Sequence, residues 1–144
     1  MEMPPDARLG LDIKRAEQAL MTAKSSAVRA ADLTVAQYAA LLALAQHPGI
    51  SAAALARACL VTPQAMTAVL KTLQARGLVE RSAHPWHRKV LETRLTEAGH
   101  RALTAADTEA VRIERRLADE FTAEEQDTLR ALLARCVQAI QQDH

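Results

Sequence analysis

The stretch that decides the expected fold is LVTPQAMTAVLKTLQARGLVERSAHPWHRKVLETRLTEAG, residues 60–99. Thr62, followed directly by a proline, predicts the start of a helix, and the glycine at position 77 predicts its end. Two strand-length runs follow, over 78–82 and 90–95, with a basic loop between them. A helix, a sharp break and a two-stranded hairpin, in this order, are typical of a helix-turn-helix that carries a β-wing.

The rest of the chain is predicted to be largely helical. Apolar residues recur at alternating steps of four and three from Leu9 onward, which predicts a first helix that ends near residue 31. Five residues able to cap a helix N-terminus mark the later helix starts: Thr34, Ser51, Thr62, Thr96 and Thr122. Thr34 and Thr122 each begin a capping box, and the second helix is expected over 35–46. The expected fold class is mainly α with a small β-wing.

Composition bounds the class of protein. The 144 residues include 49% hydrophobic but only 2% aromatic residues, and alanine and leucine, which favour helices, are frequent. This length suits one domain with a substantial core. Two cysteines are too few for a disulfide framework, and the first residues lack the basic and apolar regions of a signal peptide. No apolar run has the length of a bilayer span. Because the few cysteines fit a reduced, cytoplasmic setting, we expect a cytoplasmic protein.

Catalytic signatures are missing from the sequence. There are only four glycines, no glycine-rich phosphate loop, and no Ser, His and Asp in the order of a catalytic triad. His84 and His87 are close in sequence, but no Cys or carboxylate stands beside them at ligand spacing. We therefore expect no enzyme activity, no cofactor and no metal site, and we expect these histidines to contact phosphate or solvent.

The segment around residue 60 indicates a DNA-reading function. Only residues 59–61 separate two helices, as in a helix-turn-helix whose second helix enters the major groove. Glutamine bonds base edges, threonine meets a thymine methyl or a phosphate, and lysine meets phosphate. The residues expected to contact DNA are Thr62, Pro63, Gln64, Thr67 and Lys71 on the helix, with Arg88 and Lys89 at the wing.

Charge is unevenly distributed along a chain whose net charge is only +1. Basic residues gather between the second helix of the motif and the start of the next long helix: Lys71, Arg76, Arg81, Arg88, Lys89, Arg94 and Arg101. Residues 107–127 carry eight acidic side chains. A nearly neutral protein with this split presents a basic face to DNA. An arginine at a hairpin tip, here Arg88, suits the minor groove.

Four motifs stand in a fixed order along the chain. They are LTVAQYAAL (33–41), LA (55–56), LQARGLVER (73–81) and LTEAG (95–99). In this order they resemble the motifs of the MarR-type winged helix-turn-helix transcriptional regulators, and the resemblance covers residues 9–141. It implies a winged helix-turn-helix DNA-binding part over 33–96, flanked by dimerisation helices over 9–31 and 97–141.

The resemblance also implies partners. It implies a homodimer that binds a palindromic operator in double-stranded DNA, and relief of repression by a small-molecule effector or by oxidation. The effector pocket is expected between the second helix and the layer of the first and fifth helices. Met21, Tyr38 and Leu42 are its candidate liners, and an ordinary place in the core is the alternative for each.

Departures from the family pattern leave other functions open. His87 stands where the family's wing usually has an acid, and Ala68 where its recognition helix often has a basic residue. A helical interaction protein that has lost DNA binding is therefore one alternative. A thiol-based redox-responsive regulator is a second alternative, because the chain has the thiols of Cys59 and Cys136. We expect both thiols to be buried and inert. Trp86, the only tryptophan, either packs on the wing stem, touches DNA or has no role.

Overall fold

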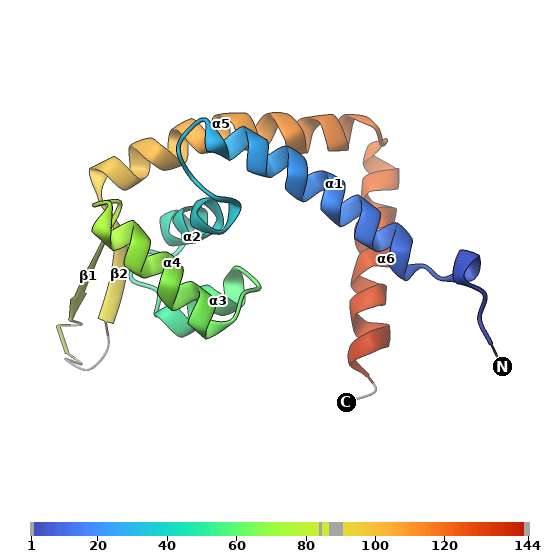
Figure 1. Cartoon of the computed structure of the whole chain (residues 1–144), viewed down its shortest axis with the longest axis horizontal. Helices are drawn as coiled ribbons and strands as arrows, with labels where there is room; N and C mark the ends of the chain where they lie inside the picture. Colours follow the sequence, from blue (N-terminus) through green and yellow to red (C-terminus); the bar gives the residue numbers. More distant parts are fainter. Residues whose placement is uncertain (1, 84, 87–90, 143–144) are drawn as a thin grey trace. The chain divides into compact units, whose positions relative to one another are not determined.

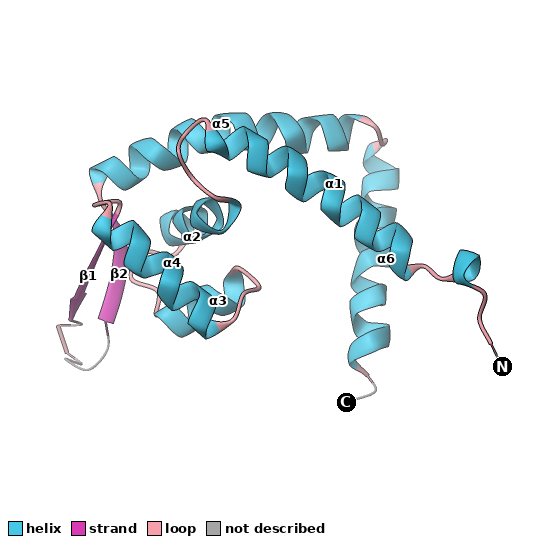
Figure 2. Cartoon of the chain, viewed as in Figure 1, coloured by secondary structure: helices cyan, strands magenta, loops and turns pink. Residues whose placement is uncertain are grey.

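A computed structural model describes residues 2–83, 85–86 and 91–142. Helices dominate this part of the chain, together with a two-stranded antiparallel hairpin (Figure 2). The elements in chain order are η1 (Pro5–Ala7), α1 (Gly10–Arg29), α2 (Val35–Gln46), α3 (Ala52–Ala58), α4 (Pro63–Ala75), β1 (Val79–Ala83), β2 (Leu91–Leu95), α5 (Glu97–Asp119) and α6 (Ala123–Gln141) (Figure 1). The chain forms two compact units, Met1–Ala110 and Val111–His144, with their boundary inside α5. The predicted fold class is confirmed.

The core of the first unit is built around α2. Its sequence, VAQYAALLALAQ, is apolar on almost every side and therefore suits an interior position. Helices α1, α3 and α4 and strand β2 pack against it. The largest apolar side chains that are fully buried are Val28, Leu41, Leu44, Leu55, Met66, Leu70 and Leu73, and each contributes about 1.5–3 kcal/mol by leaving water. None of the described helices is by itself long and apolar enough to cross a membrane.

The helix starts follow the predicted capping residues. The hydroxyl oxygen of Thr34 accepts a hydrogen bond from the Gln37 N–H at 3.1 Å, and the Gln37 side chain accepts one from the Thr34 N–H at 3.0 Å. Ser51 and Thr62 accept from N–H groups three residues further on. Each cap satisfies a donor that the helix leaves unpaired and contributes about 1 kcal/mol. The predicted starts of α2, α3 and α4 are confirmed.

The hairpin begins one residue later than predicted. Gly77 ends α4 in the left-handed conformation, with φ +73°, and the Leu78 N–H then bonds the carbonyl oxygen of Leu73 at 2.9 Å. Leu78 therefore completes the helix end, and the ladder starts with Val79 paired to Leu95. The first strand runs to Ala83 instead of ending at residue 82, while Val90, predicted to start the second strand, lies outside the described residues.

The start of α5 is fixed to the end of α4. Thr96 caps α5 by accepting from the Gly99 N–H at 3.0 Å, and its hydroxyl donates to the carbonyl oxygen of Gly77 at 2.6 Å. Gly99 lies so close to Leu78 that a Cβ at this position would meet the Leu78 carbonyl oxygen. The glycine of the LTEAG motif thus permits this close approach, for which a side chain leaves no room.

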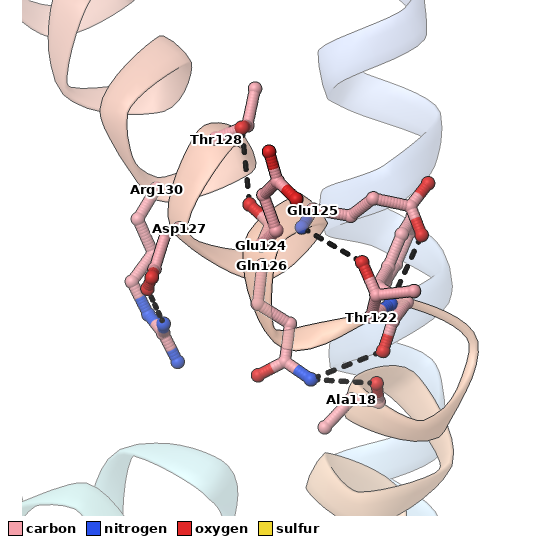
Figure 3. Close-up of polar contacts among 9 residues, drawn as sticks. Ala118, Thr122, Glu124, Glu125, Gln126, Asp127, Thr128 and Arg130 are labelled. Atoms are coloured by element: carbon pink, nitrogen blue, oxygen red, sulfur yellow. Dashed lines mark hydrogen bonds and ion pairs between the residues drawn. The ribbon is translucent and has the colours of Figure 1, made fainter.

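The second unit contains the end of α5 and all of α6. Thr122 and Glu125 form the predicted capping box, with bonds of 3.0 and 3.1 Å, and the Gln126 amide donates to the carbonyl oxygens of Ala118 and Phe121 (Figure 3). Every residue of α6 is described, and none is buried. Its apolar residues are left at 37–69% exposure: Leu129, Leu132, Leu133, Val137 and Ile140.

Candidate nucleic-acid interface

The turn between α3 and α4 has the geometry of a helix-turn-helix. The helices end and begin at Ala58 and Pro63, and they are bent by 108° to each other, within the range of about 90–120° for this motif. Leu60 makes the turn in the left-handed conformation, with φ +57°. The Val61 N–H bonds the carbonyl oxygen of Ala56 at 3.0 Å and closes the turn. The predicted helix-turn-helix is confirmed.

Helix α4 has one buried and one exposed face. Met66, Leu70 and Leu73 are at most 1% exposed and hold the helix in the core. The residues predicted to contact DNA from this helix are all exposed: Thr62, Pro63, Gln64, Thr67 and Lys71. The last three share the outer face, and the first two lie at its N-terminal end. The structure thus brings them onto one surface, while the contact that each makes stays a prediction.

Two hydroxyl groups, one on the N-cap residue of α4 and one within the helix, already make hydrogen bonds. The Thr62 oxygen accepts from the Ala65 N–H at 3.0 Å, so its own proton is still available to a phosphate oxygen. Thr67 is different, because its hydroxyl donates to the carbonyl oxygen of Pro63 at 2.9 Å. Towards solvent Thr67 therefore presents its methyl group and an oxygen that only accepts.

The exposed face of α4 also includes a residue that the sequence reasoning missed. Thr72 is exposed, four residues after the exposed Ala68 and eight after Gln64. Helical spacing places these three on one side of the helix. That spacing is the signal that identifies Thr72, and it places Ala68 at the centre of the surface.

Part of the predicted basic cluster is paired within the protein. Arg76 lies 3.5 Å from Asp32, and Arg94 lies 3.1 Å from Glu92. The Nε atom of Arg81, in β1, is buried and has no hydrogen-bond partner among the described residues. Lys71 and Arg101 are exposed. The local concentration of positive charge near α4 is therefore smaller than the sequence suggests.

The tip of the wing falls largely outside the described residues. This applies to the predicted DNA contacts Arg88 and Lys89 and to both wing histidines, His84 and His87. Trp86 is described and is 85% exposed, so its ring is not buried against the wing stem. The wing contacts stay predictions from the sequence.

The three candidate effector-pocket residues have different surroundings. Met21 is 40% exposed and lines a surface hollow of about 590 Å³ together with Gln18, Thr22, Ser25, Ser26, Arg29 and Val35. Tyr38 is buried, and its hydroxyl donates to a carboxylate oxygen of Asp107 at 2.6 Å. Leu42 is half-buried against the core. The lining of the Met21 hollow includes neither Tyr38 nor Leu42, and the pocket role of all three stays a prediction.

The two cysteines and the described histidines do not form a metal-binding group. Cys59 and Cys136 are half-buried free thiols. Partial burial at the end of α3 raises the pKa of the Cys59 thiol above its ordinary value by desolvation, which disfavours the reactive thiolate. Within residues 2–83, 85–86 and 91–142, no three His, Cys, Asp or Glu side chains are grouped to hold a metal ion.

A helix-turn-helix with an exposed second helix and a following hairpin defines a winged helix-turn-helix DNA-binding protein. Residues 31–89 match the model of the MarR family. The HTH-type transcriptional repressor Rv2887 of Mycobacterium tuberculosis is 33% identical over 133 residues, which cover 92% of this chain and 96% of that protein. On this evidence the chain belongs to the MarR family of transcriptional regulators, a family of DNA-binding proteins and not of enzymes.

Two solved structures show the same fold with different ligands. The repressor CouR, bound to a 23-mer DNA duplex, has a TM-score of 0.82 at 28% identity, over 95% of this chain and 99% of that one. The MarR family protein Rv2887 of Mycobacterium tuberculosis, in complex with salicylic acid, has a TM-score of 0.68 at 30% identity, over 94% and 97%. The winged helix-turn-helix fold is thus shared along nearly the whole chain.

Proposed function

We propose that this chain is a transcriptional repressor that binds a palindromic operator as a homodimer and is released by a small-molecule effector. The observation that carries the proposal is the exposed face of α4, whose Gln64, Thr67 and Lys71 suit base edges and phosphates. Support also comes from relatives named as repressors and from the duplex bound to CouR. We propose the cytoplasm as its place of action.

Dimerisation is proposed from the exposed apolar residues of the second unit. Helix α6 has 19 residues and none of them is buried, so it gains little packing energy within its own unit. In proteins most helical stability comes from the packing of an amphipathic face. The apolar residues of α6 share one face, because Leu129, Leu133, Val137 and Ile140 follow helical spacing. A second copy covers this face in our proposal. To bind two half-sites one DNA turn apart, such a two-fold dimer has to hold its two α4 helices about 34 Å apart.

A mobility-shift titration tests DNA binding. The full chain is titrated onto duplexes from promoter regions near its own gene, at 50 to 200 mM salt. We expect a shift whose affinity falls steeply with salt, since phosphate contacts release counterions. Gln64→Ala together with Lys71→Ala is expected to abolish it, and Gln138→Ala, on the polar side of α6, is the matched control. Salt-independent or absent binding would instead favour the helical interaction protein.

The effector is proposed to be a small organic acid. The complex of Rv2887 with salicylic acid supports this class. In this chain, Ser25 and Arg29 line two surface hollows, and the hollow that also includes Met21 is one of them. A guanidinium such as that of Arg29 suits a carboxylate. We expect salicylate to release the operator complex and Arg29→Gln to raise the concentration needed, with Lys14→Gln, on the same helix, as the control. Unchanged complexes across a panel of benzoates would reject this class.

A further inference from the structure

We propose that α4 selects A·T base pairs in the major groove of each operator half-site. In this arrangement Gln64 bonds an adenine edge, and the methyl groups of Thr67 and Ala68 contact thymines. The inference rests on the proposed function, because it specifies which bases the exposed face of α4 selects. It follows from the chemical groups that this face offers and from the groups that it lacks.

The face offers little to guanine. The major-groove edge of guanine presents two acceptors, N7 and O6, and is usually read by an arginine or a lysine. No arginine occurs between Thr62 and Ala75. The lysine in this range, Lys71, lies seven residues or about 10 Å along the axis from Gln64. Since helix-turn-helix proteins contact bases mainly with N-terminal residues of the second helix, we assign Lys71 to phosphate.

Thr67 is set up to contact a methyl group. Its hydroxyl proton is held by the carbonyl oxygen of Pro63 at 2.9 Å, so it has no donor for the acceptors of guanine. Outward it presents its own methyl group and an oxygen that only accepts, and the neighbouring Ala68, also exposed, adds a second methyl group. The C5 methyl of thymine is the one apolar feature of the major-groove edges. Two adjacent methyl groups on α4 therefore match thymines.

Gln64 supplies the polar half of the readout. It is exposed at the second position of α4, near the end of the helix that enters the groove first. Its side-chain amide has a donor and an acceptor, which pair with N7 and N6 of adenine. Guanine offers only acceptors to the same amide. The chemical complement of Gln64, Thr67 and Ala68 together is thus an adenine beside thymines.

Selection from a pool of randomised duplexes tests the inference with the full-length protein. We expect A·T pairs at the positions whose preference is lost in Gln64→Ala, with adenine favoured over guanine by about ten-fold. Replacing the contacted thymine by uracil, which removes only the methyl group, is expected to weaken binding about four-fold. Selected guanines elsewhere, unaffected by changes in α4, agree with the inference.

Two substitutions at Thr67 separate the methyl group from the hydroxyl. At the thymine that Thr67 contacts, Thr67→Val keeps a methyl and is expected to keep the preference for thymine over uracil, whereas Thr67→Ser keeps only the hydroxyl and is expected to lose that preference. Circular dichroism confirms folding of both variants. The opposite pattern, or guanine at the positions that depend on Gln64, overturns the inference while the proposed function stands. No salt-dependent binding to any member of the pool overturns both.

Discussion

Helices α2 and α6 have opposite relations to the fold. Helix α2 buries four of its 12 residues in the core of the first unit, whereas α6 has 19 residues, all described and none buried. The apolar content of α2 is thus used within one copy of the chain, and that of α6 is not. The residues that hold the DNA-reading helix are therefore different from those that are available for assembly. A substitution in the core is expected to change stability, whereas a substitution on the open face of α6 is expected to change the oligomeric state.

The largest expected effect comes from a charge on the open face of α6. Leu133 is 48% exposed, and Leu133→Asp would place a carboxylate in the proposed interface, where it loses its water. We expect a monomer in analytical ultracentrifugation, still folded in its first unit. Operator affinity should fall about 100-fold or more, because the two half-sites are no longer bound together.

The polar side of α6 provides the control for this experiment. Gln138→Asp adds the same charge opposite the apolar face and is expected to leave both mass and affinity unchanged. A dimeric Leu133→Asp protein with full affinity would show that α6 does not carry the assembly.

The second largest effect is expected inside the first unit. In Gly99→Ala the new methyl group meets the carbonyl oxygen of Leu78, and backbone atoms have to shift. We expect the free energy of unfolding to fall by about 3 kcal/mol, measured by urea denaturation. Gly10→Ala is the matched control, since nothing lies within 4 Å of a Cβ there, and a change within about 0.5 kcal/mol is expected. Equal losses of stability in Gly99→Ala and Gly10→Ala would contradict the close approach of Gly99 to Leu78.

Local signals explain how much of the fold the sequence predicted. The helix starts could be predicted because a cap joins residues only three positions apart, a spacing that a sequence shows directly. The capping residues that predicted them are Thr34, Ser51, Thr62 and Thr122. The exposed face of α4 followed from helical spacing in the same way. Leu78 was misplaced in the strand because its N–H completes the end of α4, a choice that β propensity does not register.

Contacts between distant residues could not be predicted. The hydrogen bond between Tyr38 and Asp107 joins residues 69 positions apart. Nothing in the type of either residue predicts the other as its partner. The sequence offered Tyr38 as a pocket liner, but its buried hydroxyl is engaged by this carboxylate. In the sequence Gly99 was recognised only as part of a motif. The structure gives the reason for a glycine there, because the backbone of Leu78 lies against it. The wing contacts lie outside the described residues and stay predictions.

A smaller effect is expected at the turn before α4. Leu60 is 92% exposed and has φ +57°, a conformation that costs a residue with a Cβ about 1–2 kcal/mol. Asparagine tolerates it better, so Leu60→Asn is expected to raise the free energy of unfolding by about 0.5–1 kcal/mol. Leu60→Ala removes the same exposed apolar surface but keeps the strain, and no gain is expected. A gain of equal size in both variants would show that strain is not the cause.

The smallest effect concerns the thiol in each unit. Burial raises the pKa of the Cys59 thiol, so the folded protein favours the neutral thiol, and in a Cys136→Ser background we expect slower alkylation by iodoacetamide at pH 8 than in urea. The contribution of the neutral Cys59 thiol to stability is complete below the pKa that this thiol has in the unfolded chain. It is lost as the pH rises through the pKa that the thiol has in the folded protein. Stability should therefore fall slightly at alkaline pH, less so in Cys59→Ala.

Cys136 should react faster once Leu133→Asp opens the apolar face of α6. Release of DNA by peroxide at neutral pH, abolished by Cys59→Ala, would contradict this account and favour a redox-responsive regulator.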